Sequence, residues 1–206
     1  MLYSHLMKLF NKGNLNVILN DKQIEALCQG DKPLIAPFNA DKIKKITHMG
    51  SDKKVVSYGN SEFGYDITLG NHFKYPKPGV ILDPKENNDD DWYDVTTDNS
   101  FILVGGSFVI ASVSERFIMP LTLSAYGFDK STYSRLGITV ASFVFEPGWE
   151  GYPTIAITNG GSNPVRLYPK EGFARVIFIQ GEAPKAAYGT DGKYQNQGAA
   201  VTIAKV

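Results

Sequence analysis

The pattern of hydrophobic and polar residues predicts one clear helix in the first 54 positions. Asn20 is suited to cap a helix N-terminus, and Gln23 stands three residues later, the spacing of a capping box. Gly30 provides a stop, and the apolar residues between lie at helical spacing: Ile24, Leu27 and Cys28. A similar spacing of apolar residues within 2–10 predicts an amphipathic segment in an N-terminal extension, residues 1–17, that packs on the body or on a neighbouring subunit.

From Val55 onward the pattern changes to short β-branched or aromatic runs separated by Gly, Pro, Asn and Asp. The clearest runs are 54–58, 65–69, 101–104, 107–113, 139–145, 154–158 and 174–179. Such a series predicts a mainly β fold, an antiparallel sandwich or barrel whose edges are closed by neighbouring strands or by oligomerisation. We expect one domain over residues 1–206, with one further short helix over 131–136 that ends at Gly137.

Composition excludes several classes of partner. The 206 residues carry 21 Lys+Arg and 21 Asp+Glu, so the net charge of zero provides no global field for nucleic acid. Residues 1–54 hold nine lysines and five acids, a bias that could mark a phosphate-seeking arm, but the lysines are scattered and a solvated surface is favoured. The longest apolar run, 101–111, is shorter than the roughly 20 residues that span a bilayer, so no membrane partner is expected.

Cysteine and histidine are too few for a zinc cage of these ligands. The chain has one cysteine, Cys28, and three histidines, and it lacks His-x-Glu and Pro-Cys-x-x-Cys, so zinc-dependent nucleoside deaminases are excluded. With no internal disulfide and no signal-peptide pattern, we expect a cytoplasmic protein, in the host cytoplasm if the source is viral. Cys28 is expected in the core and His72 on the surface.

The stretch 83–98 is strongly acidic, with seven acids and one lysine. Clustered carboxylates suit a hard cation such as calcium, but the order of ligands differs from that of an EF-hand. A mobile, solvated loop is the favoured interpretation.

Three stretches carry candidate chemistry. In 128–137, Ser131 and Thr132 open the short predicted helix and Arg135 closes it, a pattern that suits an anionic phosphate; the alternative is a helix cap with a surface arginine. In 146–151, Glu146 and Glu150 flank a tryptophan in a tight turn, so they could orient a water or hold nucleotide-bound magnesium, or simply be exposed turn residues. The tail 193–200 combines a lysine, a tyrosine and three amides, and either closes over a ligand or is frayed.

These stretches, with two earlier ones, give the chain a resemblance to the trimeric dCTP deaminase/dUTPase superfamily, closest to its dCTP deaminase branch. Residues 20–30 are similar to that branch's N-terminal Asp-x-x-Ile helix, and 64–71 to its Val-Asp-Val-Arg-Leu-Gly-Asn strand. Residues 130–137 match Arg-Ser-Ser-x-x-Arg-Leu-Gly, 147–151 match Pro-Gly-Trp-x-Gly, and 193–199 match Lys-Tyr-x-Asn-Gln. The five motifs occur in the family's order over residues 18–203.

The resemblance implies a homotrimer of β-clip subunits that binds dCTP or dUTP with Mg²⁺ and deaminates dCTP to dUTP and ammonia without zinc. No direct protein ligand to the metal is implied. It places the nucleotide on the start of the short helix and on a lid-like tail, 188–206, by way of Lys130, Ser131, Thr132, Arg135, Lys193, Tyr194 and Gln197. In the same family the buried aspartate equivalent to Asp66 is structural.

One departure from the family falls at the reacting centre. Five residues beyond Gly151, where family deaminases carry the glutamate that activates water, this chain has Ala156, whose methyl group cannot transfer a proton. The segment between Arg135 and Glu146 is also about two residues shorter than in the family, by our alignment of the motifs. The expected catalytic residues are therefore Glu146, Ser131 and Arg135, with a dUTPase-like pyrophosphatase that uses Glu146, or a non-catalytic or altered-substrate nucleotide binder, as alternatives.

Overall fold

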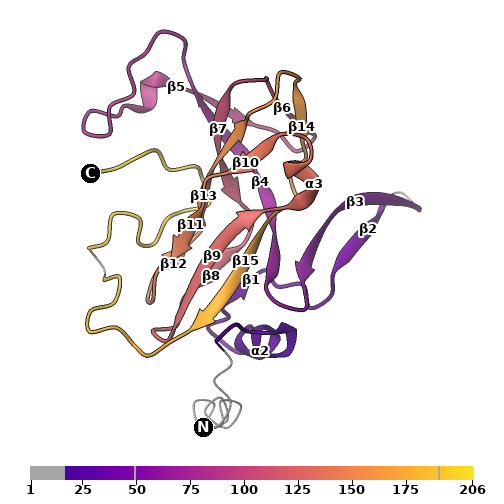
Figure 1. The fold of residues 1–206 in the computed structure, drawn as a ribbon, viewed down its shortest axis with the longest axis vertical. Helices are drawn as coiled ribbons and strands as arrows, with labels where there is room; N and C mark the ends of the chain where they lie inside the picture. Colours follow the sequence, from indigo (N-terminus) through magenta and orange to yellow (C-terminus); the bar gives the residue numbers. More distant parts are fainter. Residues whose placement is uncertain (1–16, 49, 190) are drawn as a thin grey trace.

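A curled antiparallel sheet forms the body of the computed structural model, which describes residues 17–48, 50–189 and 191–206 (Figure 1). Its main path runs β10-β13-β7-β4-β15-β9-β11, and smaller sheets are β1-β8-β12 and β14-β6. The strands are β1 (Ile35–Ala36), β2 (Ile43–His48), β3 (Ser51–Asn60), β4 (Tyr65–Pro76), β5 (Trp92–Thr96), β6 (Phe101–Leu103), β7 (Phe108–Val113), β8 (Arg116–Ile118), β9 (Leu123–Asp129), β10 (Ile138–Val140), β11 (Phe143–Phe145), β12 (Glu150–Gly151), β13 (Thr154–Asn159), β14 (Val165–Leu167) and β15 (Gly172–Gln180). The predicted mainly β fold is confirmed.

Short helices lie at the margin of this body. Helix α2 (Asp21–Leu27) has the predicted capping box, in which the Gln23 N–H donates to Asn20 Oδ1 and the Asn20 N–H donates to Gln23 Oε1, both at 3.1 Å. Cys28 follows it and packs against the core, and burial raises the pKa of its thiol to about 12. Helix α3 (Ser131–Ser134) is shorter than predicted, and residues 2–10 lie outside the described residues.

The prediction of one continuous strand over residues 139–145 is wrong. The run 139–145 forms two strands, β10 and β11, which pair with different partners, β13 and β9. The chain changes partner at 141–142, where it leaves the β13 edge after the Ala141 N–H has donated to Ala156 O at 2.9 Å. On β9, Gly127 lies directly beneath the Phe143 ring, with no room there for a Cβ.

Strand β4 is central, and its first six residues are buried on both faces. Ile67 and Leu69 belong to the apolar core, whereas Asp66, fully buried, receives hydrogen bonds from Lys130 Nζ at 2.6 Å and Arg175 Nε at 2.8 Å. Burial raises the pKa of Asp66, but the hydrogen bonds and charges of these two cations outweigh it and hold the pKa below its usual range. Asp66 is therefore buried and hydrogen-bonded, as the resemblance implied.

The sequence favours a mobile, solvated loop for the acidic stretch 83–98, but the structure shows regular elements there. It contains a 3-10 turn, η1 (Asp89–Asp91), and strand β5, which pairs with β4. Lys74 on β4 lies between Asp89 and Asp94 and pairs with both. Within the described part of the chain, no three His, Cys, Asp or Glu side chains gather to hold a metal, and no helix is long and apolar enough to cross a membrane.

Candidate nucleotide site

Helix α3 presents the predicted phosphate-binding residues to solvent. Ser131, Thr132 and Arg135 are exposed, and the Arg135 side chain makes no ion pair or hydrogen bond with any residue that the structure describes. The N-cap is Lys130, without a side-chain capping bond, so Ser131 does not cap the helix. Lys130 itself is directed into the protein, towards Asp66, rather than towards solvent. Three of the four predicted residues here are therefore available to a ligand.

The tight turn at 146–151 separates its two carboxylates. The Trp149 N–H donates to Glu146 O at 3.0 Å, and Gly148 occupies the turn with φ of +85°. Trp149 is buried and stacks on Phe145, with ring centroids 5.0 Å apart. Glu150 pairs with Arg116, whereas Glu146 is exposed, so Glu146 is the acid of this turn that remains available for chemistry.

The C-terminal tail is hydrogen-bonded to this turn rather than frayed. Trp149 Nε1 donates to Tyr194 O at 2.8 Å, and the Gln195 side chain bridges the turn by bonding Glu150 N and Gly148 O. Gln197 Nε2 donates to Thr154 Oγ1 at 2.6 Å. Gly151 permits this approach, because a Cβ there would lie 2.8 Å from Gln197 N.

A cavity of about 300 Å³ lies between the turn, the tail and the β11 and β13 strands. It brings together three sequence-predicted residues, Glu146, Tyr194 and Gln197, while Lys193 is exposed and does not line it. The other lining residues are mainly aromatic or polar: Phe143, Val144, Phe145, Trp149, Pro153, Thr154, Tyr188 and Thr202. Aromatic walls with a few polar groups are typical of sites for small organic ligands.

Ala156 lies on strand β13, whose side chains alternate between two faces. Ile155 and Ile157 face the core, and Ala156 is half-buried on the opposite face, two residues from Thr154 of the cavity. Position 156 is therefore on the cavity side of the strand, where a longer side chain would extend away from the core.

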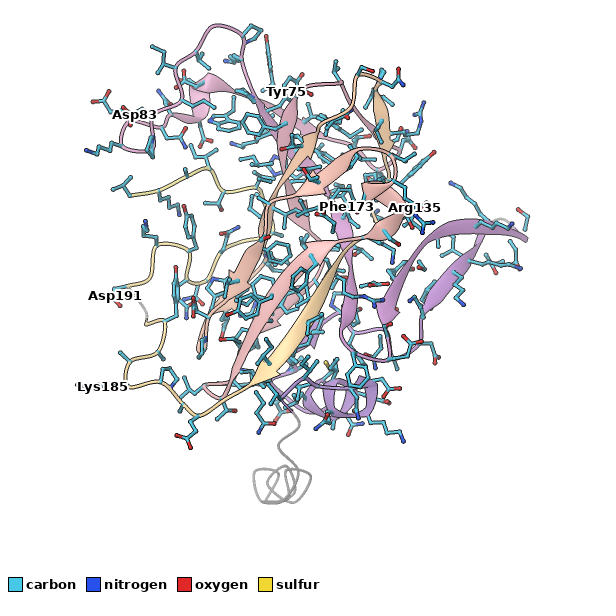
Figure 2. All side chains as sticks on the ribbon, in the orientation of Figure 1. Tyr75, Asp83, Arg135, Phe173, Lys185 and Asp191 are labelled. Atoms are coloured by element: carbon cyan, nitrogen blue, oxygen red, sulfur yellow. The ribbon has the colours of Figure 1, made fainter. Side chains whose placement is uncertain are left out.

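The two predicted halves of the site lie on opposite sides of one chain. Figure 2 shows Arg135 on one side of the sheet and, across the sheet from it, Lys185, which precedes the tail, and Asp191, which belongs to it. Thr132 lines a separate crevice next to the β2–β3 hairpin, together with Lys44, Lys53 and Lys54. The sequence predicts a solvated surface for these lysines. No local pattern in the sequence indicates that they lie near Thr132, because they are about 80 residues away along the chain.

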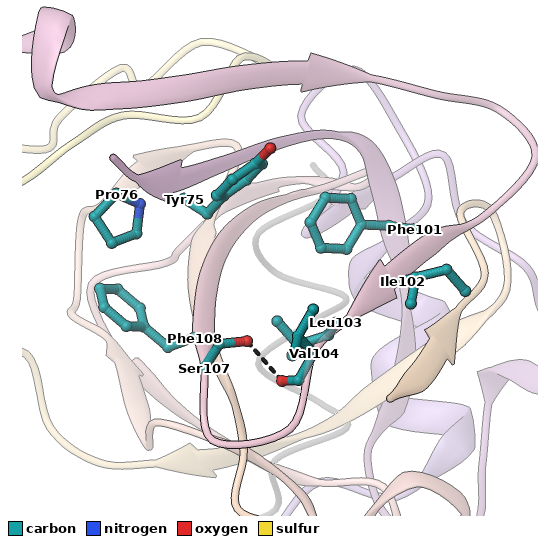
Figure 3. A pocket seen from close by; sticks show the side chains of 8 residues that line it. All are labelled: Tyr75, Pro76, Phe101, Ile102, Leu103, Val104, Ser107 and Phe108. Carbon is teal, nitrogen blue, oxygen red and sulfur yellow. Dashed lines mark hydrogen bonds between the residues drawn. The ribbon is translucent and has the colours of Figure 1, made fainter. Parts of the chain in front are cut away.

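A third cavity, of about 410 Å³, is almost entirely apolar (Figure 3). Its walls come from the end of β4 and from β6 and the start of β7, and Phe101 stacks on Phe73 beneath it. Its one side-chain hydroxyl apart from the Tyr75 phenol, Ser107, donates to Val104 O at 2.6 Å. With no charged group in its walls, it is unsuited to a polyanion.

His72 is a residue whose role the sequence did not reveal. It was expected on the surface, but its side chain is 15% exposed and lies between Asp94 and the tail. Its Nε2 is 2.6 Å from Asp94 Oδ1, and its Nδ1 accepts from the Val201 N–H. Only the folded tail reveals this contact, because His72 and Val201 are 129 residues apart.

The curled antiparallel sheet, the exposed hydroxyls of α3 and the tail bonded to the Pro-Gly-Trp turn define a mainly β protein with a candidate site for a small ligand. More narrowly, the chain belongs to the dCTP deaminase-like family, whose model matches residues 18–181. It is 36% identical over 192 residues to the dCTP deaminase of Francisella tularensis subsp. novicida, covering 91% of this chain and 98% of that protein. It is 40% identical over 159 residues to the dCTP deaminase of Helicobacter pylori strain Shi470, covering 75% and 84%.

Among solved structures, the 2'-deoxycytidine 5'-triphosphate deaminase of Agrobacterium tumefaciens has a similar fold, with a TM-score of 0.56 at 19% identity. The match covers 82% of this chain and spans about half, 49%, of that chain. At this identity the likeness supports the fold alone.

Proposed function

We propose that this protein binds a deoxynucleoside triphosphate with Mg²⁺ and hydrolytically deaminates dCTP to dUTP and ammonia without zinc. The observation that carries the proposal is the cavity in which Glu146, Tyr194 and Gln197 meet around Trp149. Curated relatives at 36% and 40% identity are dCTP deaminases, which supports the same substrate.

In this proposal Glu146 takes the place of the family glutamate that is missing at Ala156. Glu146 is the acid among the described residues that line the cavity, and no described side chain bonds its carboxylate. It accepts one proton from water as the oxygen bonds to C4 of cytosine and delivers it to the amino group, so that the C4–N bond breaks and ammonia leaves. The second proton of the water ends on N3 of the uracil product. Tyr194 and Gln197, which come from the tail, keep bulk water out of the cavity.

We further propose a homotrimer in which α3 of one subunit faces the cavity of another. Within one chain the two halves of the site are apart, so a second copy is needed to bring Ser131, Thr132 and Arg135 to the nucleotide. Exposed apolar side chains on strands β9 and β11 support a subunit interface on that part of the sheet. On β9 and β11, Tyr126 and Val144 stand directly opposite one another and are 40% and 44% exposed, and Phe128 beside them is 48% exposed.

Mg²⁺ fits this arrangement as part of the nucleotide. The ion would be held by phosphate oxygens and water, because Mg²⁺ usually keeps several of its waters and binds through substrate phosphates. The ion would supply charge neutralisation for the triphosphate, and the residues expected beside it are the hydroxyls of Ser131 and Thr132.

A product assay tests the proposal. The purified protein is incubated with each dNTP and Mg²⁺, and ammonia, pyrophosphate and nucleotide products are measured separately. Ammonia and dUTP from dCTP are expected, and they should be lost in Glu146→Gln. Pyrophosphate and dNMP would instead support a dUTPase-like pyrophosphatase that uses Glu146. Tight binding without turnover would support a non-catalytic binder, the hypothesis that the alanine at position 156 favours.

A further inference from the structure

We propose that the crevice between the β2–β3 hairpin and α3 binds the terminal phosphates of the nucleotide, with Lys53 and Lys54 as its main cations. The inference rests on the proposed function, since it extends the triphosphate end of that site. The crevice measures about 550 Å³, within the range of small-ligand sites, and its walls include Lys44, Lys53, Lys54 and Thr132.

The four lysines of the hairpin and Lys42, which directly precedes it, fall into two groups. Lys42 lies 3.6 Å from Asp66, and Lys45 lies 3.8 Å from Asp52, so these two have acidic partners. The three that line the crevice are exposed and make no ion pair with any residue between 17 and 206 that the structure describes: Lys44, Lys53 and Lys54.

The pairing of the hairpin strands adds to this unbalanced charge. Lys45 and Lys54 are directly opposite each other across β2 and β3. Like charges in that position destabilise a strand pair, and Asp52, two residues before Lys54 on β3, is paired with Lys45. An anion in the crevice would neutralise Lys54 and remove the repulsion.

The opposite wall offers polar groups and one acid. Thr132 and Tyr168 contribute hydroxyl groups, and Glu171 contributes a carboxylate that is 9% exposed. Glu171 Oε2 accepts from the Val56 N–H at 2.7 Å, so this oxygen is already engaged in holding the hairpin to the body. With three cations against one engaged acid, the crevice is positive.

The chemistry favours a compact polyphosphate over an extended nucleic acid. Lysine ammonium groups act as point charges that several phosphate oxygens can share. Thr132 is one of the predicted phosphate-binding residues, and Arg135, the C-cap of α3, is exposed and pairs with none of the residues that the structure describes (Figure 2). The chain as a whole has no net charge to attract a long polyanion.

Calorimetric titration of the full chain tests the inference with three probes: dCTP with Mg²⁺, dCMP, and inorganic triphosphate. The variant is Lys53→Gln/Lys54→Gln, and the matched control is Lys22→Gln/Lys32→Gln, which also removes two exposed lysines but leaves the crevice unchanged. We expect the first variant to raise the Kd for dCTP and for inorganic triphosphate about tenfold or more, with dCMP binding unchanged. The control should stay within about twofold of wild type.

The outcomes separate the two proposals. If the wild type binds dCTP and the crevice variant binds it equally well, or if both double variants weaken dCTP binding equally, the crevice inference is overturned and the proposed function stands. If the wild type binds no dNTP, the proposed function is overturned, and the assignment of the crevice to a nucleotide falls with it. Unchanged circular dichroism and elution volume would confirm that the variants fold.

Discussion

The imidazole of His72 joins the C-terminal tail to strand β4, because its Nδ1 accepts a hydrogen bond from the Val201 N–H at 2.8 Å. Its Nε2 contacts Asp94 Oδ1 at 2.6 Å, which orients the ring and leaves Nδ1 as the acceptor. Nearby, Thr154 Oγ1 accepts from the Thr202 N–H and from Gln197 Nε2. Residues 197–202 are therefore fastened to β4 and to β13, and β13 also contributes Thr154 to the wall of the cavity beside the tail.

Replacing His72 should loosen this tail. In His72→Ala the Val201 N–H loses its acceptor, and a net hydrogen bond of about 1 kcal/mol corresponds to roughly a fivefold change in the population of the released tail. Limited trypsin digestion should therefore cut the tail about five times faster. Asn71→Ala is the control, because Asn71 bonds Asp98 and not the tail; equal cleavage of both variants would mean that His72 does not hold the tail.

Replacing Arg135 should weaken nucleotide binding without affecting the fold. The side chain is exposed and has no partner among the described residues, so Arg135→Ala should change the free energy of unfolding little. A charge-assisted phosphate contact is lost, and the Kd for dCTP should rise by about tenfold to a hundredfold. Arg166→Ala, an exposed arginine that bonds Ser100, is the control; unchanged affinity in Arg135→Ala would remove α3 from the site.

Restoring the missing carboxylate should raise deamination. In Ala156→Glu the new side chain projects from the cavity face of β13, next to Thr154, and supplies a proton acceptor of the kind that contributes about a hundredfold or more to rate. Ammonia release from dCTP is the measurement, and Ala156→Gln is the isosteric control without a base. A variant that binds dCTP but gains no activity would mean that the missing carboxylate at position 156 does not limit deamination.

Glu115 should make stability fall as pH rises. The carboxyl is 1% exposed, and burial raises its pKa to about 7, although Thr68 N–H and Oγ1–H donate to it. Because the folded state holds the proton more tightly than the unfolded state, stability is full below about pH 4.5 and is lost progressively up to about pH 7, by about 3 kcal/mol. A free energy of unfolding that instead fell as the pH was lowered from 7 to 4.5 would contradict this prediction.

Urea unfolding at pH 5 and pH 8 measures this effect. Glu115→Gln cannot ionise and keeps a carbonyl oxygen for Thr68, so its stability should change less than that of the wild type between the two pH values. Comparing the two proteins cancels the other titrating groups. The same pH dependence in both would exclude Glu115 as its source.

The features that the sequence predicted well are those fixed by local chemistry. The capping box of α2 involves Asn20 and Gln23, three residues apart, and the turn at Pro147–Gly148 follows from residue types that favour a bend. The repeated short apolar runs are typical of antiparallel strands, so the fold class followed from them as well. Ala156 could be located on a strand because its neighbours alternate in polarity.

What only the tertiary structure decided depends on residues that are distant in the chain. Lys130 resembles a phosphate ligand in sequence, but Asp66, 64 residues earlier, is buried beside it, and a buried carboxylate needs a cation. The sequence predicts a solvated surface for the lysines of the β2–β3 hairpin, yet the fold brings Lys44, Lys53 and Lys54 to the walls of one crevice with Thr132. Sequence spacing determines which backbone elements form, whereas packing determines which charges they bring together, and the proposed site depends on the second.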